Sequence, residues 1–375
     1  MIHVGVNLLW CVPAEVGGSE QYLVRQLAGL LEARAPVELT LFATARFREA
    51  HAAELDGCTF VDAPHDGRRR TIRIVDEHTW LHRRTAALDL VHHGGGTAPR
   101  RGRRPYVLTI HDLQYRSLQQ HFSRGKRWYL DAVVPGAARR AATVAVPSEY
   151  VRDSVVRQLH VHPSQVTVVP HGYEPELLTE TTPEADLRAR FGLGSARIVV
   201  YPAMTAPHKR HDFLVELLRR HWTDQDLALV LIGGRGAADD DLAGLIAGSE
   251  PSVRGRIFRL GRVSDADRNG LLAMAEAMVF PSEYEGFGAP VIEAMAIGTP
   301  VVCSDATCLP EVAGGAALVR PLQLDAWASA LDEVTARRDD LVRAGRDRVA
   351  RFTSAASGEA LLATYRQALE LGRRS

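Results

Sequence analysis

Two glutamates that flank a glycine-rich turn are the strongest chemical signal in this sequence of 375 residues. Glu285 follows the apolar segment 277–280, and Glu293 falls inside the helix predicted next. Between them stand Gly286 and Gly288, whose missing Cβ atoms let backbone amides approach a ligand. Free amides at a helix start favour anions, and paired carboxylates can accept hydrogen bonds from the vicinal diols of a sugar or ribose. The segment therefore predicts a site for a hydroxyl-rich, anionic ligand.

Lys209 is the second candidate, because it follows the strand predicted at 197–201. It is also one of only two lysines among 45 basic residues. Where arginine fills most cationic positions, a remaining lysine is favoured to act as a compact ammonium that a planar guanidinium cannot replace. At the end of a strand, this ammonium would stabilise the charge of a departing diphosphate.

Two further polar segments follow predicted strands in the first half. His111 directly follows one strand, and no nucleophilic Ser or Cys is paired with it, so a catalytic triad is not expected. The loop at 7–19 closes with Gly17 and Gly18, which allow close approach to a phosphate or an acceptor. Ser19 is expected to cap the helix that follows.

Three further polar segments of the second half are considered as site candidates. Arg262 and Val263 follow the strand predicted at 257–260. Ser264 and Asp267 fit a capping box, which explains Ser264 without any function. The aspartates at 239–241 are expected to lie in a solvated loop. Since no His, Cys or Asp cluster has metal-ligand spacing, neither a metal site nor a cofactor is expected.

The chain that must position these residues alternates short apolar strands with amphipathic helices in both halves. This alternation predicts an α/β fold with two doubly wound domains, each a parallel sheet covered by helices. Ligands of such sheets bind beyond the carboxyl ends of the strands. The predicted strands are 3–9, 37–43, 88–92, 106–110, 143–147, 165–169, 197–201, 228–232, 257–260, 277–280, 300–304 and 316–319.

The domain boundary is expected in the linker at 170–184, which is rich in proline and threonine. We expect an N-terminal domain over 1–172 and a C-terminal domain over 173–353. The tail 354–375 is predicted to be a helix that packs back toward the N-terminal domain.

The segment from Glu285 to Glu293 resembles the E-x7-E element of retaining GT-B glycosyltransferases of the family 4 type, also called glycosyl transferases group 1. The resemblance continues through 298–302 and 309–312, covers most of the second half and extends more loosely over the first. It implies two Rossmann-like domains facing across a cleft. It also implies transfer of a sugar, with retention, from a nucleotide-sugar donor to an acceptor hydroxyl on a glycan, a lipid-linked glycan or a small molecule.

The resemblance also assigns roles by position. It implies that Glu285, Gly286, Phe287 and Gly288 bind the donor sugar and that Glu293 binds the ribose. The implied catalytic residues are Glu285 and His111, the latter positioning the sugar.

In the same family, glycines such as Gly17 and Gly18 lie against the diphosphate together with a lysine at the place of Lys209. The turn that holds Arg262 and Val263 lies against the base. The usual diphosphate arginine aligns with Met204, so Arg210, another cation or backbone amides would supply the second charge. The sequence Pro-His-Lys-x-His at 207–211 resembles members that use mannosyl donors, which makes GDP-mannose the first expectation.

The net charge is zero, but residues 1–175 hold 22 basic and 17 acidic residues, and the rest hold 23 and 28. With the arginine runs 68–70 and 100–104, this asymmetry suggests that the first half meets an anionic membrane or acceptor. Nucleic acid is not expected, because a binding domain would be far more basic. No membrane-spanning stretch and no secretory signal are visible, and the four cysteines suggest no disulfide framework, so we expect a cytoplasmic protein.

Three alternatives remain open in the sequence. A nicotinamide-dependent dehydrogenase is disfavoured, because the first strand is not followed by Gly-x-Gly-x-x-Gly. A catalytically silent nucleotide-sugar-binding protein is disfavoured by the intact glutamates, Lys209 and His111, although Met204 leaves some room for it. A GT-B epimerase is disfavoured by the His111 loop and the spacing of the glutamates.

Overall fold

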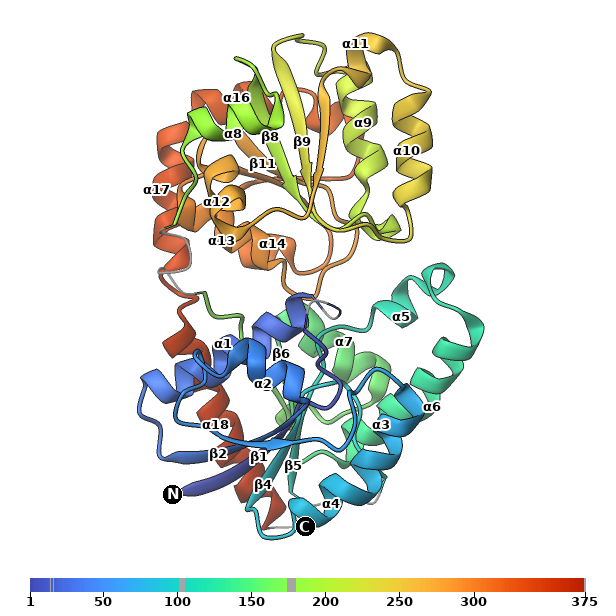
Figure 1. Cartoon of the computed structure of the whole chain (residues 1–375), viewed down its shortest axis with the longest axis vertical. Coiled ribbons are helices and arrows are strands. Elements are labelled where there is room, and N and C mark those ends of the chain that lie inside the picture. The colour runs from blue at the N-terminus through green and yellow to red at the C-terminus, as the bar shows by residue number, and fades with distance from the viewer. Residues whose placement is uncertain (14, 16, 101–104, 174–179, 374–375) are drawn as a thin grey trace. The chain divides into compact units, whose positions relative to one another are not determined.

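The computed structural model describes the whole chain except residues 14, 16, 101–104, 174–179 and 374–375. The chain forms two compact units (Figure 1), the first made of Met1–Gly172 with Phe352–Ser375 and the second of Tyr173–Arg351. Each unit is a parallel sheet with helices packed against it, which confirms the predicted α/β fold with two Rossmann-like domains.

The first unit is built on a seven-stranded sheet with the order β3-β2-β1-β4-β5-β6-β7. β1 lies between β2 and β4, with Ile2 opposite Val37 and Val4 opposite Leu90. Because the strand order reverses between β1 and β4, their carboxyl ends mark the place where such a sheet binds ligands. The strands are β1 (Ile2–Asn7), β2 (Val37–Ala43), β3 (Thr59–Asp62), β4 (Leu90–His93), β5 (Tyr106–Thr109), β6 (Thr143–Val146) and β7 (Val166–Val168).

The helices of the first unit include one from the far end of the chain. They are α1 (Gly18–Glu32), α2 (Ala45–His51), α3 (Arg70–Asp76), the π-helix η1 (Glu77–Leu81), α4 (His82–Arg84), α5 (Gln114–Ser117), the 3-10 helices η2 (Gln119–His121) and η3 (Pro163–Gln165), α6 (Arg124–Arg140), α7 (Glu149–Leu159) and α18 (Ser354–Gly372).

The last helix, α18, packs closely against α1 through glycines. A Cβ on Gly29 of α1 would lie 1.9 Å from the carbonyl oxygen of Ser354, and one on Gly358 of α18 would lie 2.4 Å from the carbonyl carbon of Gly29. Leu361 and Tyr365 of α18 are fully buried in the same core as the strands of the first sheet. The helix is therefore an integral part of the first unit.

The second unit is built on a six-stranded sheet with the order β10-β9-β8-β11-β12-β13. Its strands are β8 (Arg197–Pro202), β9 (Leu227–Ile232), β10 (Ile257–Gly261), β11 (Ala277–Phe280), β12 (Val301–Ser304) and β13 (Leu318–Arg320). Its helices are α8 (Glu184–Phe191), the 3-10 helix η5 (Pro207–Lys209), α9 (His211–Arg220), α10 (Asp239–Ala247), α11 (Pro251–Arg254), α12 (Asp265–Ala273), α13 (Ala289–Ile297), α14 (Leu309–Ala313), α15 (Leu324–Trp327), α16 (Ala330–Ala336) and α17 (Arg338–Val349).

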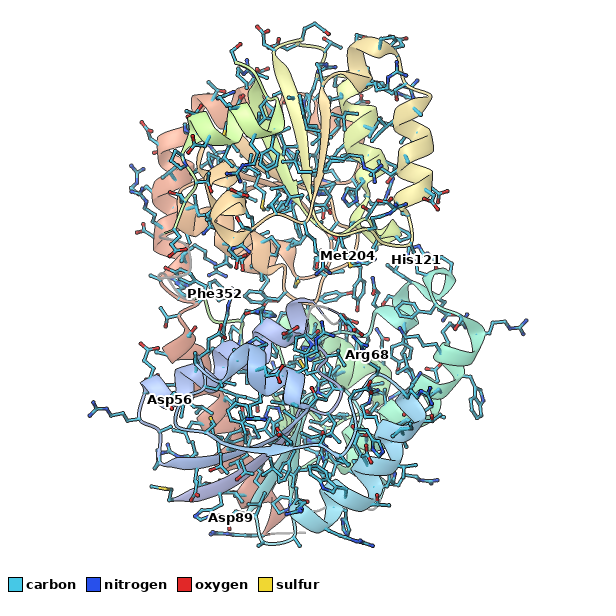
Figure 2. All side chains as sticks on the ribbon, in the orientation of Figure 1. Asp56, Arg68, Asp89, His121, Met204 and Phe352 are labelled. Carbon is cyan, nitrogen blue, oxygen red and sulfur yellow. The ribbon has the colours of Figure 1, made fainter. Side chains whose placement is uncertain are left out.

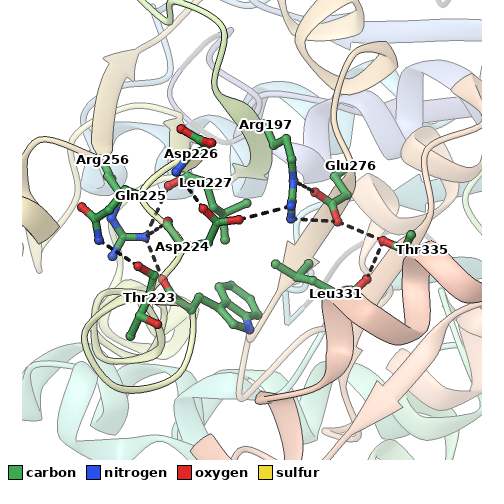
Figure 3. A network of polar contacts seen from close by, with 11 residues as sticks. Arg197, Thr223, Asp224, Gln225, Asp226, Leu227, Arg256, Glu276, Leu331 and Thr335 are labelled. Carbon is green, nitrogen blue, oxygen red and sulfur yellow. Dashed lines mark hydrogen bonds and ion pairs between the residues drawn. The ribbon is translucent and has the colours of Figure 1, made fainter.

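A polar network ties the amino ends of the second sheet together (Figure 3). Arg197, at the start of β8, donates 2.9 Å and 3.3 Å hydrogen bonds to Glu276 and Asp224. Arg256, before β10, donates to the carbonyl oxygens of Trp222 and Asp224 at 2.7 Å and 2.9 Å. These charges are thus used for structure at the edge opposite the carboxyl ends.

Candidate functional site

Lys209 and Glu285 lie at the carboxyl edge of the second sheet, on loops that follow the neighbouring strands β8 and β11. Lys209 ends η5, and its carbonyl oxygen accepts a 2.7 Å hydrogen bond from the hydroxyl of Tyr201. Glu285 lies between β11 and α13. The strand order therefore brings two predicted site residues, 76 positions apart, to one place.

The two side chains form an ion pair in which Nζ of Lys209 donates to Oε1 of Glu285. Their side chains are only 17% and 13% exposed. Nζ also lies 5.5 Å from the centroid of the Phe280 ring, which gives the ammonium an aromatic neighbour. Because little water screens this ammonium, an anion that reaches it would be attracted more strongly than at an open surface.

The backbone of Glu285 is fixed by the loop that follows β12. Its amide donates a 3.0 Å hydrogen bond to Oγ1 of Thr307, and its carbonyl oxygen accepts one from Sγ of Cys308 at 3.3 Å. Thr307 adopts a left-handed backbone conformation with φ 54°, which is uncommon for a β-branched residue and marks a constrained turn. The carboxylate of Glu285 is thus presented from a rigid loop.

The predicted glycine turn leads directly into α13. Gly288, with φ 85°, is the N-cap residue of this helix, and Pro290 lies in its first turn. A Cβ on Gly288 would lie 2.7 Å from Cδ2 of Leu309, so only glycine fits both the backbone conformation and the space. The turn therefore leads the backbone into the start of α13, where helix amides suit a ligand with hydroxyl or anionic groups.

The remaining residues of this segment differ in exposure. Phe287 is 4% exposed, so its ring packs inside the unit and only its backbone is available at the turn. Gly286 and Glu293 are partly exposed, and Glu293 lies one turn into α13. Glu285 thus lies on the loop that leads into α13, and Glu293 lies on α13 itself.

Arg210 lies beside Lys209, but its guanidinium already faces carboxylates. It pairs with Asp212 at 3.0 Å and lies 3.9 Å from Glu283, and the pairing with Asp212 raises its pKa. Met204, in the loop after β8, is 51% exposed (Figure 2). The position aligned with the family's arginine therefore carries an exposed apolar side chain.

Arg262 and Val263 follow β10, as predicted. A Cβ on Gly234 would lie 2.9 Å from Nε of Arg262, so the arginine packs over the loop that follows β9. Ser264 accepts a 3.1 Å hydrogen bond from the amide of Asp267 and caps α12, which is the structural role expected for it.

The structure adds a pocket that the sequence did not indicate. It has a volume of about 420 Å³ and opens beside the loops that follow β8, β9 and β10. Its lining includes Ala203, Thr205, His211, Gly233, Arg259 and Gly261. Glycines at two strand ends were the only available sequence signal, and they are common in turns of all kinds.

His211 and Asp239 give this pocket its polar wall. His211 is 4% exposed, its Nε2 lies 3.3 Å from the carbonyl oxygen of Ala203, and burial lowers its pKa to about 4. Asp239 is also buried and pairs with Arg235 at 2.8 Å and with Arg259. The expected loop at 239–241 is therefore wrong, because these aspartates begin α10, and Asp239 is buried where it neutralises two arginines. Asp240 and Asp241 are exposed to solvent, as expected.

In the first unit, His111 follows β5, as predicted, and is enclosed by aromatic rings. Its Nε2 donates a 2.9 Å hydrogen bond to the carbonyl oxygen of Gly94. Its ring centroid lies 5.8 Å from that of Trp10 and 5.3 Å from that of Tyr22. Burial lowers its pKa to about 4, so the imidazole is neutral at pH 7 and its Nδ1 can accept a hydrogen bond.

Gly17 and Gly18 form the start of α1. Gly17, with φ 64°, is the N-cap residue, and α1 begins at Gly18 without a side-chain cap. The expectation that Ser19 caps this helix is therefore wrong, because the helix begins two residues earlier, with Gly17 in the N-cap position. Among the described residues of the chain, no atom lies within 4 Å of a Cβ built on either glycine, which leaves room beside this helix start.

The structure also contains a buried polar cluster near His111 that was not predicted from the sequence. Asn7, at the end of β1, donates to Oε1 of Glu77 at 3.2 Å and lies 3.1 Å from Nδ1 of His93, at the end of β4. Burial raises the pKa of Glu77 and lowers that of His93 to about 3. Asn7 also accepts a hydrogen bond from the amide of Leu9, so the cluster fixes the loop that carries Trp10.

In the part of the chain that the structure describes, no helix has both the length and the apolar character needed to cross a bilayer.

Family comparisons assign both halves of the chain. Residues 196–337 match the family model described as glycosyl transferases group 1, and residues 16–177 match that of glycosyltransferase family 4. The O-antigen chain mannosyltransferase B of Escherichia coli is 28% identical over 325 residues, which cover 82% of this chain and 84% of that protein. The MMP alpha-(1->4)-mannosyltransferase of Mycolicibacterium hassiacum is 29% identical over 254 residues, which cover 64% of this chain and 59% of that protein.

Solved structures agree on the fold. HepE of Anabaena, crystallised with UDP and glucose, superposes with a TM-score of 0.74 at 19% identity, and the match covers 98% of this chain and all of that one. The carboxyl-edge loops described above are thus carried by two domains of the GT-B type. The chain belongs to the glycosyltransferases, with a family 4 domain in its first half and a group 1 domain in its second.

Proposed function

We propose that the protein transfers a sugar, with retention of anomeric configuration, from a nucleotide-sugar donor to an acceptor hydroxyl. The observation that carries this proposal is the ion pair of Lys209 with Glu285, on the loop that leads into α13. The site combines a lysine ammonium fixed by an ion pair, a carboxylate and a glycine turn. The ammonium suits a diphosphate, and the carboxylate and the backbone of the turn suit the hydroxyls of the attached sugar. GDP-mannose is the proposed donor, because two relatives are named mannosyltransferases.

The site residues divide the donor between them in this proposal. Lys209 binds the diphosphate and stabilises the charge that it gains as it leaves. Glu285 and the backbone of Gly286, Phe287 and Gly288 bind the hydroxyls of the sugar. Glu293 binds the ribose, while Arg262 and Val263 lie against the base.

In the first unit we assign contacts to the transferring sugar and to the diphosphate to two loops. His111 is neutral, so it acts as a hydrogen-bond partner for the transferring sugar rather than as a cation. Gly17 and Gly18 offer an open helix start to the diphosphate. In the transfer step, the acceptor oxygen bonds to the anomeric carbon, the bond to the diphosphate oxygen breaks, and the departing phosphate takes the hydroxyl proton.

The acceptor belongs to a glycan, a lipid-linked glycan or a small molecule, and the enzyme acts in the cytoplasm with peripheral contact to an anionic membrane. The O-antigen relative supports a glycan acceptor. The basic excess of the first half supports the membrane contact.

A donor panel tests the proposal. GDP-mannose, GDP, UDP-glucose and UDP are compared by thermal shift, since the tightest ligand stabilises the fold most. Transfer from each donor to mannosides and lipid-linked glycans is then followed by release of the nucleoside diphosphate, and the product anomer is read by NMR. GDP-mannose should give the highest turnover and an α-linked product. A β-linked product would refute retention, preference for a UDP-sugar would refute the donor, and absence of transfer to every acceptor class would refute the reaction.

A further inference from the structure

Three consecutive residues after β12 contact both ends of the glycine turn that begins at Glu285. Oγ1 of Thr307 accepts a 3.0 Å hydrogen bond from the amide of Glu285, and the thiol of Cys308 donates one of 3.3 Å to the carbonyl oxygen of Glu285. Leu309 closes the other end, because its Cδ2 would lie 2.7 Å from a Cβ on Gly288. Cys308 and Leu309 are fully buried, and the helices that follow the two loops, α13 and α14, pack against each other (Figure 1). The segment after β12 is therefore a fixed support for the turn.

Thr307 holds an unfavourable backbone conformation in this support. Its φ of 54° lies in the left-handed region, where a branched Cβ crowds the backbone and glycine is favoured. Strain of this kind persists only where the surrounding contacts impose it, and it gathers at functional sites. Glycine would relieve the strain, but it has no hydroxyl to accept the amide of Glu285. The threonine therefore indicates that the hydroxyl, rather than the conformation, is required at this position.

The other side of the same loop is tied to the segment that carries Lys209. The amide of Glu283 donates a 2.8 Å hydrogen bond to the carbonyl oxygen of His208, which directly precedes the lysine. The residues before Glu285 are thus held by the lysine segment, whereas both peptide groups of Glu285 are held by the segment after β12. A change of Thr307 should therefore move the carboxylate and leave the ammonium in place.

We propose that Thr307 is a positioning residue for sugar transfer, whose hydroxyl fixes the amide of Glu285 and so orients the carboxylate toward the donor sugar. The inference rests on the proposed function and deepens it, because it adds a residue that acts through Glu285. A carboxylate that meets the transition state needs such support, since a displacement of about 1 Å can cost about 10²-fold in rate. Loss of the hydroxyl should therefore lower turnover and spare binding of the nucleoside diphosphate.

Three variants of Thr307 separate the hydroxyl from the backbone strain. Thr307→Val removes the hydroxyl and keeps the branched Cβ, Thr307→Gly removes both, and Thr307→Ser keeps the hydroxyl. Turnover of GDP-mannose should fall roughly three- to tenfold in the first two, the range expected for one neutral hydrogen bond, and Thr307→Ser should recover most of it. Calorimetry should give the wild-type affinity for GDP in all three. UDP-glucose and UDP replace this pair where the donor panel prefers them.

His160→Gly is the matched control. His160, at the end of α7, is exposed and has the same left-handed conformation, with φ 56°. The change relieves the same kind of strain at a position outside the site, so it should keep the wild-type turnover. Thermal unfolding checks that every variant is folded.

Each other outcome has a definite meaning. Wild-type turnover in both Thr307→Val and Thr307→Gly, or a loss in Thr307→Ser as large as theirs, would overturn the inference. A loss in Thr307→Val with normal turnover in Thr307→Gly would assign the effect to strain, and a fall in GDP affinity equal to the fall in turnover would show a general support of the site. Both results would also overturn it.

Failure of the proposed function is recognised separately. If the wild type binds GDP-mannose without transferring the sugar, the proposed function fails and the inference is read from binding alone. The extra affinity of GDP-mannose over GDP should then be smaller in Thr307→Val than in the wild type, and an equal value would overturn the positioning of Glu285 by Thr307.

Discussion

The ammonium of Lys209 contacts the carboxylate of Glu285, so two residues assigned to different parts of the donor neutralise each other. A diphosphate that binds Lys209 must share this cation with Glu285. The carboxylate is then free to turn its second oxygen toward a sugar hydroxyl. In the proposed donor site, this one contact would couple binding of the phosphate to orientation of the sugar.

The first prediction concerns this pair. Lys209→Ala should weaken nucleoside-diphosphate binding by roughly 1.5–3 kcal/mol, the contribution of a charge-assisted contact. It should also lower the unfolding free energy, because it leaves the largely buried Glu285 carboxylate without its cation. Lys209→Ala/Glu285→Gln should recover part of that stability without recovering affinity. Calorimetry and urea unfolding of the three proteins measure both effects, and unchanged diphosphate affinity in Lys209→Ala would remove the lysine from the donor site.

The second prediction separates the two glutamates. Glu293→Ala should weaken the nucleoside diphosphate and the intact donor about equally, because the ribose is present in both. Glu285→Ala should not weaken the bare diphosphate, because it removes the carboxylate that shares Lys209. It should lower turnover on the order of 10²-fold, because the partner of Glu285 is the sugar, whose charge changes in the transition state. Affinity and turnover are measured for each variant. Equal weakening of the bare diphosphate by both changes would contradict this division.

The third prediction concerns Met204, whose exposed side chain stands where the family has an arginine. Met204→Arg should tighten nucleoside-diphosphate binding by about 1.5 kcal/mol, as expected for a hydrogen bond to a charged group. Met204→Gln is the control for size and polarity and should change little. If both variants bind like the wild type, the loop does not face the diphosphate.

The fourth prediction is a loss of stability in acid. His92 and His93 are buried at the end of β4, and burial lowers the pKa of each to about 3. The unfolded chain binds these protons at higher pH than the folded chain does. The free energy of unfolding is therefore highest above pH 6.5, where both histidines are neutral in the folded and the unfolded chain. It decreases as the pH falls from 6.5 toward 3, because only the unfolded chain binds the protons in this range. The slope is about 1.4 kcal/mol per pH unit for each histidine.

Urea unfolding at pH 7, 6 and 5 measures this slope. His92→Gln keeps a polar side chain near Thr109, which lies 2.7 Å from Nε2 of His92, and should show a smaller decline between pH 7 and pH 5. A variant that declines as steeply as the wild type would show that His92 titrates normally in the folded chain.

The sequence predicted those parts of the fold that depend on local pattern. Ala277–Phe280 was placed correctly to the residue, because a buried parallel strand appears as a continuous apolar run. Val37–Ala43 was also placed correctly, because its apolar residues first alternate with Glu38 and Thr40 and then run on to its buried end. The edge strand Thr59–Asp62 was missed, since four residues with a polar residue at each end are too few to distinguish from a loop.

The parts of the site that depend on distant partners could not be predicted. Asp239 looked like part of a solvated acidic run, because nothing local announces Arg259 as its partner from a neighbouring strand. Asn7, Glu77 and His93 come from three separate segments, and each alone resembles an ordinary core or surface residue. Lys209 and Glu285, which the structure brings into contact, could be proposed from the sequence because each carries a local signal, a rare residue type or a glycine turn.

The crossing of α18 over α1 sets the order in which the protein can mature during synthesis. Tyr365 contacts His92, so the core of the first unit includes a segment that leaves the ribosome only after the whole second unit. Residues 173–351 are contiguous and can fold while translation continues, whereas the first sheet waits for its final helix with part of its apolar surface uncovered. A nascent chain stopped before residue 354 would therefore be a chaperone client, although every residue of its first sheet is already present.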